Sequence, residues 1–175
     1  PAVSFEGPES PMPHSETGVS DTLGISLRPE YPVYSTQTSK ASFVLINQSN
    51  RNIMCGEEYC ITYEDEQGIW RKLPTDHFFF SVGYLVQPGE YRIRTASLYP
   101  EVHPNKPGRY RLLYHLTILD THTRIQMMTE FRLSNDEKEW KQTKKLKIPI
   151  HLTITQNSDN SATSETSADE ETSGQ

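Results

Sequence analysis

Residues 56–74, GEEYCITYEDEQGIWRKLP, carry the pattern that decides the fold. Tyr59, Ile61 and Tyr63 alternate with small or polar residues, which is typical of a strand with one buried face. The acidic run 64–66 and then Gly68 follow, and glycine readily adopts the positive φ that a hairpin loop requires. Because an apolar pattern returns after the glycine, the stretch predicts a β-hairpin.

Outside this hairpin the chain repeats the same design of short strands separated by turns. Two Pro-Gly pairs, at positions 88–89 and 107–108, predict turns that each precede a strand. The last two patterns before residue 134 are the longest and predict a hairpin with one face in the core. Many short strands with turn signals between them predict an all-β antiparallel sandwich. The expected strands outside the first hairpin cover 23–28, 40–47, 91–96, 110–118, 125–133 and 148–154.

Both ends of the chain differ in composition from the middle. The N-terminal end is rich in Pro, Ser, Gly and Glu, which predicts a flexible leader. The C-terminal end is a Ser, Thr, Asp and Glu tract without an aromatic residue, which predicts a disordered acidic tail. The expected segments are the leader 1–20, the sandwich 21–134, an extension 135–155 and the tail 156–175.

The extension is expected to contain a short helix and one further strand. Ser134 and Glu137 have the spacing of a capping box, in which each side chain bonds the backbone of the other residue. Ile148, Leu152 and their neighbours then alternate with polar residues. Pro149 favours an edge position for this strand, because proline cannot donate a hydrogen bond to a neighbouring strand.

Charge and motifs exclude several classes of function. The chain has 17 basic and 23 acidic residues, a net charge of −6, which does not favour a nucleic-acid-binding protein. Nine of the acids lie in residues 1–21 and 156–175, so residues 22–155 hold 14 acids against all 17 bases. No apolar run is long enough to span a membrane. Since HxH, HExxH, GxSxG, P-loop and GxGxxG patterns are absent, the sequence predicts no catalytic residue, no metal site and no cofactor.

Each of three further features has two interpretations. The acidic tip 64–66 is either a cation ligand set or a solvated turn, and the turn is favoured because a hard cation needs more oxygens. The lysines of 138–147 either contact an anionic surface or belong to a solvated helix face, and the interleaved acids favour the solvated face. Cys55 and Cys60 form either a local bridge or two semi-buried thiols, of which the thiols are favoured.

The aromatic run Phe78, Phe79 and Phe80 is the candidate partner-binding site. Strand alternation buries only some of three consecutive rings unless both faces are covered. The run therefore either enters the core from a loop or leaves an exposed apolar patch, and such patches are typical of interaction surfaces.

Several motifs in order resemble a bacterial immunoglobulin-like domain family of the Big type, over residues 18–133. The chain departs from the family pattern at Cys55, in a longer 98–106 connection and in the extension. The resemblance implies an immunoglobulin-like sandwich with structural roles for Trp70 in the core or at its rim, and for Tyr110 in a tyrosine corner. The matching residues are Asn47, Gln48 and Ser49; the segments 56–59, 68–74 and 85–90, the last with Pro88 and Gly89; and Pro107, Gly108 and Tyr110 within 107–111.

The resemblance also implies a function without catalysis. We expect an interaction or accessory module of the bacterial cell envelope whose partner is another protein. The sequence begins at Pro1 and its leader is similar to lipoprotein tethers, so we expect an extracytoplasmic protein, periplasmic or on the cell surface, with a lipid anchor upstream as one means of attachment. The alternative is a proteinase-inhibitor-like protein that inserts the 98–106 or the 120–123 loop into a protease.

Overall fold

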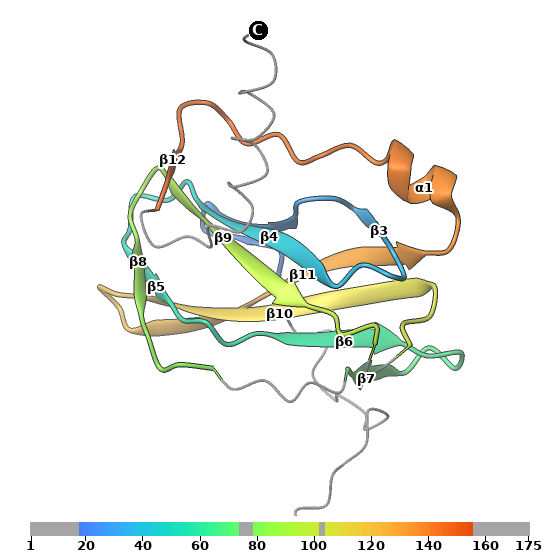
Figure 1. Cartoon of the computed structure of the whole chain (residues 1–175). Coiled ribbons are helices and arrows are strands. Elements are labelled where there is room, and N and C mark those ends of the chain that lie inside the picture. The colour runs from blue at the N-terminus through green and yellow to red at the C-terminus, as the bar shows by residue number, and fades with distance from the viewer. Residues whose placement is uncertain (1–17, 74–78, 102–103, 156–175) are drawn as a thin grey trace, which may run out of the picture.

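The computed structural model describes residues 18–73, 79–101 and 104–155, and these form two stacked sheets and one helix (Figure 1). The leader before residue 18, Phe78 and the acidic tail lie outside the described residues. The five-stranded sheet has the order β1 (Asp21–Thr22), β2 (Ile25–Pro29), β4 (Lys40–Asn47), β9 (Glu90–Ser97) and β12 (Thr153–Ile154). The second sheet has the order β3 (Val33–Ser35), β11 (Thr123–Ser134), β10 (Gly108–Ile118), β5 (Ile53–Cys55) and β8 (Tyr84–Val86), with β6 (Cys60–Glu64) beside β10 and β7 (Trp70–Lys72) beside β6.

The core lies between the sheets and follows the predicted alternation. Along β10 every second side chain from Tyr110 to Ile118 is buried and belongs to one cluster with Phe43 and Phe131. The long hairpin is confirmed, because β10 pairs with β11 from Gly108 opposite Leu133 to Ile118 opposite Thr123. An all-β sandwich is therefore the fold, as the sequence predicts.

The predicted hairpin turn at Gly68 and the predicted Pro-Gly turn at positions 88–89 both form as expected. In the first, β6 pairs antiparallel with β7 and Gly68 has a φ of 77°. In the second, the N–H of Glu90 donates to the carbonyl of Gln87 at 3.0 Å and Gly89 has a φ of 80°. The positive φ explains why glycine occupies each position.

The five-stranded sheet is covered on its outer face as well as its inner face. Val44, Ile46 and Ile93 point away from the main core and form a second apolar cluster with Leu152. Leu146, Ile148, Tyr91 and Ile154 pack against this cluster. Figure 1 shows the C-terminal segment passing over this side of the sheet. Burial on both faces accounts for the uninterrupted apolar run from Phe43 to Ile46.

The extension differs in two details from the sequence prediction. The helix α1 (Glu137–Gln142) forms, but its N-cap is Asp136, whose carboxylate accepts a hydrogen bond from the N–H of Lys138. Ser134 instead donates to the carboxylate of Glu139, so the expected capping box is wrong. The predicted strand 148–154 shrinks to the two residues of β12, which lies at the sheet edge parallel to β9. Pro149 begins a turn here, closed by the N–H of Leu152.

Candidate functional site: an apolar sheet edge

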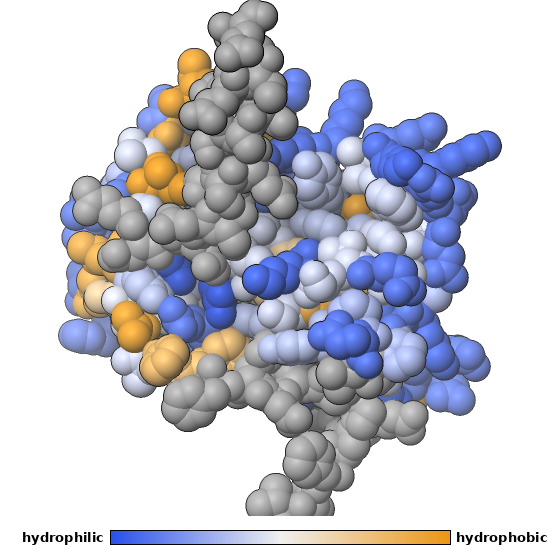
Figure 2. Space-filling model, in the orientation of Figure 1, coloured by the Kyte–Doolittle hydropathy of each residue, from blue (hydrophilic) through white to orange (hydrophobic). Residues whose placement is uncertain are grey.

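An exposed apolar surface lies along β8, the last strand of the second sheet. Phe80 is 67 % exposed, Val82 44 % and Leu85 38 %. Figure 2 shows hydrophobic residues gathered on the side of the molecule where Figure 1 places β8. Within the described residues β8 pairs with β5 and with no strand on its other side. We call this surface, formed by Phe80, Val82 and β8, the β8 edge.

The predicted aromatic run separates into residues with different roles. Phe79 is partly buried, and its ring meets that of Tyr59 edge-on at a centroid distance of 5.0 Å. Phe80 points outward and is among the most exposed large apolar side chains of the described residues. In the described part of the run, Phe79 therefore anchors the segment to the core, and Phe80 contributes to an exposed surface.

A polar network behind the β8 edge joins it to the other sheet. The hydroxyl of Tyr84 donates to the carboxylate of Glu57 at 2.6 Å, and the hydrogen bond raises the pKa of Tyr84. The guanidinium of Arg92 lies over the Tyr84 ring, 3.8 Å from its centroid. Arg94 donates to the carbonyl of Glu57 at 3.0 Å. These contacts hold β8 in place against β9, so the edge is presented on a rigid support.

The network forms where the strand that faces β10 is interrupted. Cys55 of β5 pairs with Leu116, whereas Cys60 of β6 pairs with Leu113, so four residues of one strand stand opposite two of the other. The extra residues loop toward β9, and the hydroxyl of Tyr114 donates to the carbonyl of Gly56. Sequence analysis missed this network, although two arginines alternating with apolar residues in β9 were its signal.

Both cysteines are free thiols. Leu113 and Leu116 are three positions apart on β10, so their side chains and those of the paired cysteines point to opposite faces of the sheet. The predicted alternative of a local bridge is therefore not formed, because the sulfur atoms lie on different sides. Burial raises the pKa of both thiols.

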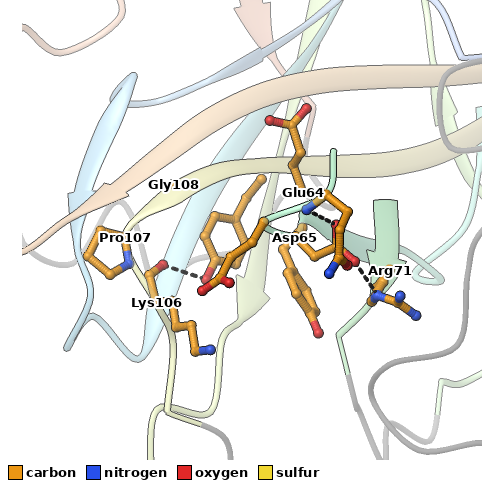
Figure 3. A pocket seen from close by; sticks show the side chains of 10 residues that line it. Glu64, Asp65, Arg71, Lys106, Pro107 and Gly108 are labelled. Atoms are coloured by element: carbon orange, nitrogen blue, oxygen red, sulfur yellow. Dashed lines mark hydrogen bonds and ion pairs between the residues drawn. The ribbon is translucent and has the colours of Figure 1, made fainter. Parts of the chain in front are cut away.

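The acidic hairpin tip borders an open pocket of about 530 Å³ (Figure 3). Asp65 accepts hydrogen bonds from the N–H groups of Gln67 and Ile69 and from Arg71 at 2.5 Å. Desolvation opposes ionisation of Asp65, but these hydrogen bonds outweigh it and lower its pKa. The carboxylate thus stabilises the turn. Among the described residues no three His, Cys, Asp or Glu side chains are placed to hold a metal.

Trp70 and Tyr110 have structural roles on opposite faces of the second sheet. Trp70 lies on the outer face, where the guanidinium of Arg111 covers its ring at 3.9 Å and Arg109 lies at 5.4 Å. Tyr110 lies in the core and donates to the carbonyl of Lys106 at 2.7 Å, which is the hydrogen bond expected of a tyrosine corner. Trp70 therefore lies outside the main core cluster, beneath two arginines, and Tyr110 anchors the segment before Pro107 and Gly108.

The two loops of the inhibitor alternative are short or internally tied. Asn105 donates to the carbonyl of Leu98 at 3.1 Å, which closes the described part of the 98–106 loop. The 120–123 connection is a tight turn with His122 at a φ of 54°. Residues 102–103 lie outside the described residues, and inhibition of a protease stays a prediction.

These structural features agree with a comparison of the whole sequence against known families. A family model described as a bacterial Ig-like domain matches residues 21–132. The chain belongs to this family. The match confirms the resemblance that the motifs indicate. The matched residues end before the extension that covers the five-stranded sheet. Bacterial Ig-like domains are generally non-catalytic accessory modules and are typically extracellular.

Solved structures offer more distant similarities to this bacterial Ig-like domain. The Pseudomonas fluorescens alkylpurine DNA glycosylase AlkC, bound to DNA containing an abasic site analog, is 18 % identical, with a TM-score of 0.36. The match covers 61 % of this chain and only 29 % of that one. A Bordetella pertussis protein assigned as ApaA is 17 % identical, with a TM-score of 0.38, and the match covers 69 % of this chain and 98 % of that one. The search of curated proteins finds no match. In the described part of the chain no helix is long and apolar enough to cross a membrane.

Proposed function

We propose that this bacterial Ig-like domain is a non-enzymatic interaction module of the cell envelope that binds a partner protein through the β8 edge. The observation that carries the proposal is the exposure of Phe80 and Val82 just before β8, and of Leu85 on β8, the last strand of a sheet. An open edge offers backbone groups for another strand, and neighbouring apolar side chains add contact area. The preferred occupant is an extended segment of the partner.

Two further observations support this surface over others. Phe79 packs on Tyr59, and Arg92 stacks on Tyr84, so the edge is held in one conformation before binding. A pre-ordered surface binds with less loss of conformational entropy. The edge also carries no lysine or proline between Phe80 and Val86, although such residues commonly protect exposed edges from pairing.

The experiment is site-specific photo-cross-linking followed by measurement of affinity. A photoreactive residue replaces Val82 in the full chain, and a control chain carries it at Ile69 on the distant β6–β7 hairpin. After incubation with envelope extract, we expect one protein to cross-link through position 82 and not through position 69. The affinity of that purified protein is then measured for Phe80→Lys and Leu85→Lys, with Ile69→Lys as the matched control.

We expect each of the two edge variants to weaken binding at least tenfold, because a buried apolar contact becomes a charge that must be desolvated. Ile69→Lys should bind like the wild type. An unchanged affinity in both edge variants, or cross-linking that does not depend on position, contradicts the proposal. Phe79 is not a suitable test site, since its replacement would disturb the contact with Tyr59.

A further inference from the structure

The C-terminal extension presents a basic and apolar surface that the β8 edge does not include. Residues 143–155, TKKLKIPIHLTIT, contain three lysines and no acidic residue, and we call them the basic strap. One side of the strap is fixed, because Leu146, Ile148 and Leu152 pack on the outer face of β4 and β9. The side chains between these anchors are therefore directed away from the sheet.

Hydrogen bonds hold the strap at both ends. The N–H of Leu146 donates to the carbonyl of Glu30 at 2.7 Å. At the other end, the N–H of Thr153 donates to the carbonyl of Gly89 at 2.9 Å, and that of Thr155 to Tyr91 at 2.8 Å. The strap is thus held against the sheet at both ends, so its exposed side chains have defined positions.

Ile150 occupies the apex of the strap and is fully exposed. It follows Pro149 in the turn that the N–H of Leu152 closes at 3.0 Å. Figure 2 shows hydrophobic residues near the end of the molecule where Figure 1 places this turn. Turns normally carry Gly, Asn, Asp or Ser, so a large apolar side chain at the apex adds nothing to turn formation.

Within the strap itself, all formally charged side chains are positive and precede the apex in the chain. Lys144, Lys145 and Lys147 are exposed, and the carboxylate of Glu30 lies 3.8 Å from the ammonium of Lys145. Lys141 of α1 differs, since it pairs with Glu137 within the helix. The sequence interpretation of a solvated, balanced face therefore holds for α1, while the strap has an excess of positive charge. Among the described residues, Glu90 also lies beside the strap, opposite Thr153, and its carboxylate accepts a hydrogen bond from the N–H of Gln87.

We propose that the basic strap docks on a lipid bilayer that contains anionic headgroups, with Ile150 inserted between headgroups and the three lysines above them. Positive charges beside an apolar tip are the combination by which peripheral proteins bind such membranes. A soluble polyanion would use the lysines alone, so the exposed isoleucine favours the bilayer. This surface is separate from the β8 edge, and failure of either proposal leaves the other intact.

The test is co-sedimentation of the full chain with sonicated vesicles of phosphatidylcholine, with and without 30 % phosphatidylglycerol. We expect binding to the anionic vesicles only, weakening as salt rises from 50 to 300 mM. The double variant Lys144→Gln with Lys147→Gln should lower partitioning about 30-fold, and Ile150→Ser about tenfold. All three side chains are exposed, so the free energy of unfolding in urea should be the same in these variants as in the wild type.

Matched controls separate this surface from general charge and hydrophobicity. Lys40→Gln with Lys72→Gln removes two exposed lysines elsewhere, and Leu23→Ser removes an exposed apolar side chain elsewhere. Both controls should partition like the wild type. The proposal is overturned if anionic vesicles do not bind the chain, or if controls and strap variants lose binding equally. It is also overturned if Ile150→Ser binds normally while polyphosphate displaces the chain, which would identify a polyanion site.

Discussion

Arg92 is 2 % exposed although it carries a charge, and its surroundings explain how this is tolerated. Its guanidinium stacks on Tyr84 and its Nε donates to the hydroxyl of Tyr114 at 3.4 Å. A buried cation that lacks such contacts would be strongly destabilising. Arg92 therefore links the two sheets behind the β8 edge through its stacking on Tyr84 and its hydrogen bond to Tyr114.

Replacing Arg92 tests this role. Arg92→Ala should lower the free energy of unfolding by about 2–4 kcal/mol, because it leaves a cavity and removes the stacking on Tyr84. Arg109→Ala, which removes an arginine from a largely exposed ion pair, should cost no more than about 1 kcal/mol. Urea unfolding of both variants at pH 7 provides the measurement. Equal losses in the two variants would argue against a special role for Arg92.

The lowered pKa of Glu130 predicts how the stability of the fold depends on pH. Desolvation alone would raise its pKa, but hydrogen bonds and charges from Arg109 and Arg111 outweigh this and lower it. Because the folded pKa lies below the unfolded one, the contribution is present above about pH 4.5 and is lost as pH falls through the folded value. Partial exposure limits the contribution to less than about 1 kcal/mol.

The measurement is the urea midpoint between pH 6 and pH 3 for the wild type and for Glu130→Gln. We expect the wild type to lose more stability than the variant over this range, since the variant has no carboxylate to protonate. Parallel curves would show that the two arginines do not stabilise the ionised carboxylate.

At the scale of elements, turn chemistry explains most of what could be predicted. Gly68 and Gly89 lie where the patterns of the sequence break, and each has a positive φ in the structure. The strands on either side of Gly68, β6 and β7, then pair as neighbours in the chain, whereas Gly89 connects β8 of one sheet to β9 of the other. Forming either turn needs only local information. The strap is different, because 148–154 alternates like a strand but packs through side chains, and only two of its residues join a sheet.

A substitution at Gly89 separates backbone strain from packing. A Cβ atom at Gly89 would meet nothing within 4 Å, so Gly89→Ala should cost about 1 kcal/mol through its φ of 80° alone. Gly68→Ala has the same open surroundings and a φ of 77°, and should cost a similar amount. Urea unfolding of both variants tests this. A much larger loss at Gly89 alone would mean that the β8–β9 turn also controls strap attachment.

At the scale of the whole molecule, the described part of the chain is a family domain with one addition. The family match ends at residue 132, and the segment after it covers the outer face of the five-stranded sheet. Without this cover, Val44, Ile46 and Ile93 would form an apolar patch on the surface. Patches of this kind cause association.

Shortening the chain tests the contribution of the extension. A chain that ends at Ser134 should have a free energy of unfolding roughly 2–4 kcal/mol lower than that of the full chain. It should also self-associate at micromolar concentration. Leu152→Asp in the full chain should reproduce part of both effects, because it places a charge against the same cluster. Urea unfolding and sedimentation velocity measure the two effects. A shortened chain that stays monomeric and equally stable would show that the strap is dispensable for folding.

The sequence by itself determined the all-β class, the 64–68 and 87–90 turns and the β10–β11 hairpin, because alternation and turn residues act between neighbours in the chain. Only the tertiary structure decided that Phe80 is exposed while Phe79 is partly buried, that Trp70 lies under arginines on an outer face, and that the cysteines point to opposite sides. It also decided that Arg92 is buried and that the strap covers the sheet. The physical reason is that burial depends on what packs against a residue from distant parts of the chain, and a local pattern specifies only which side chains share a face.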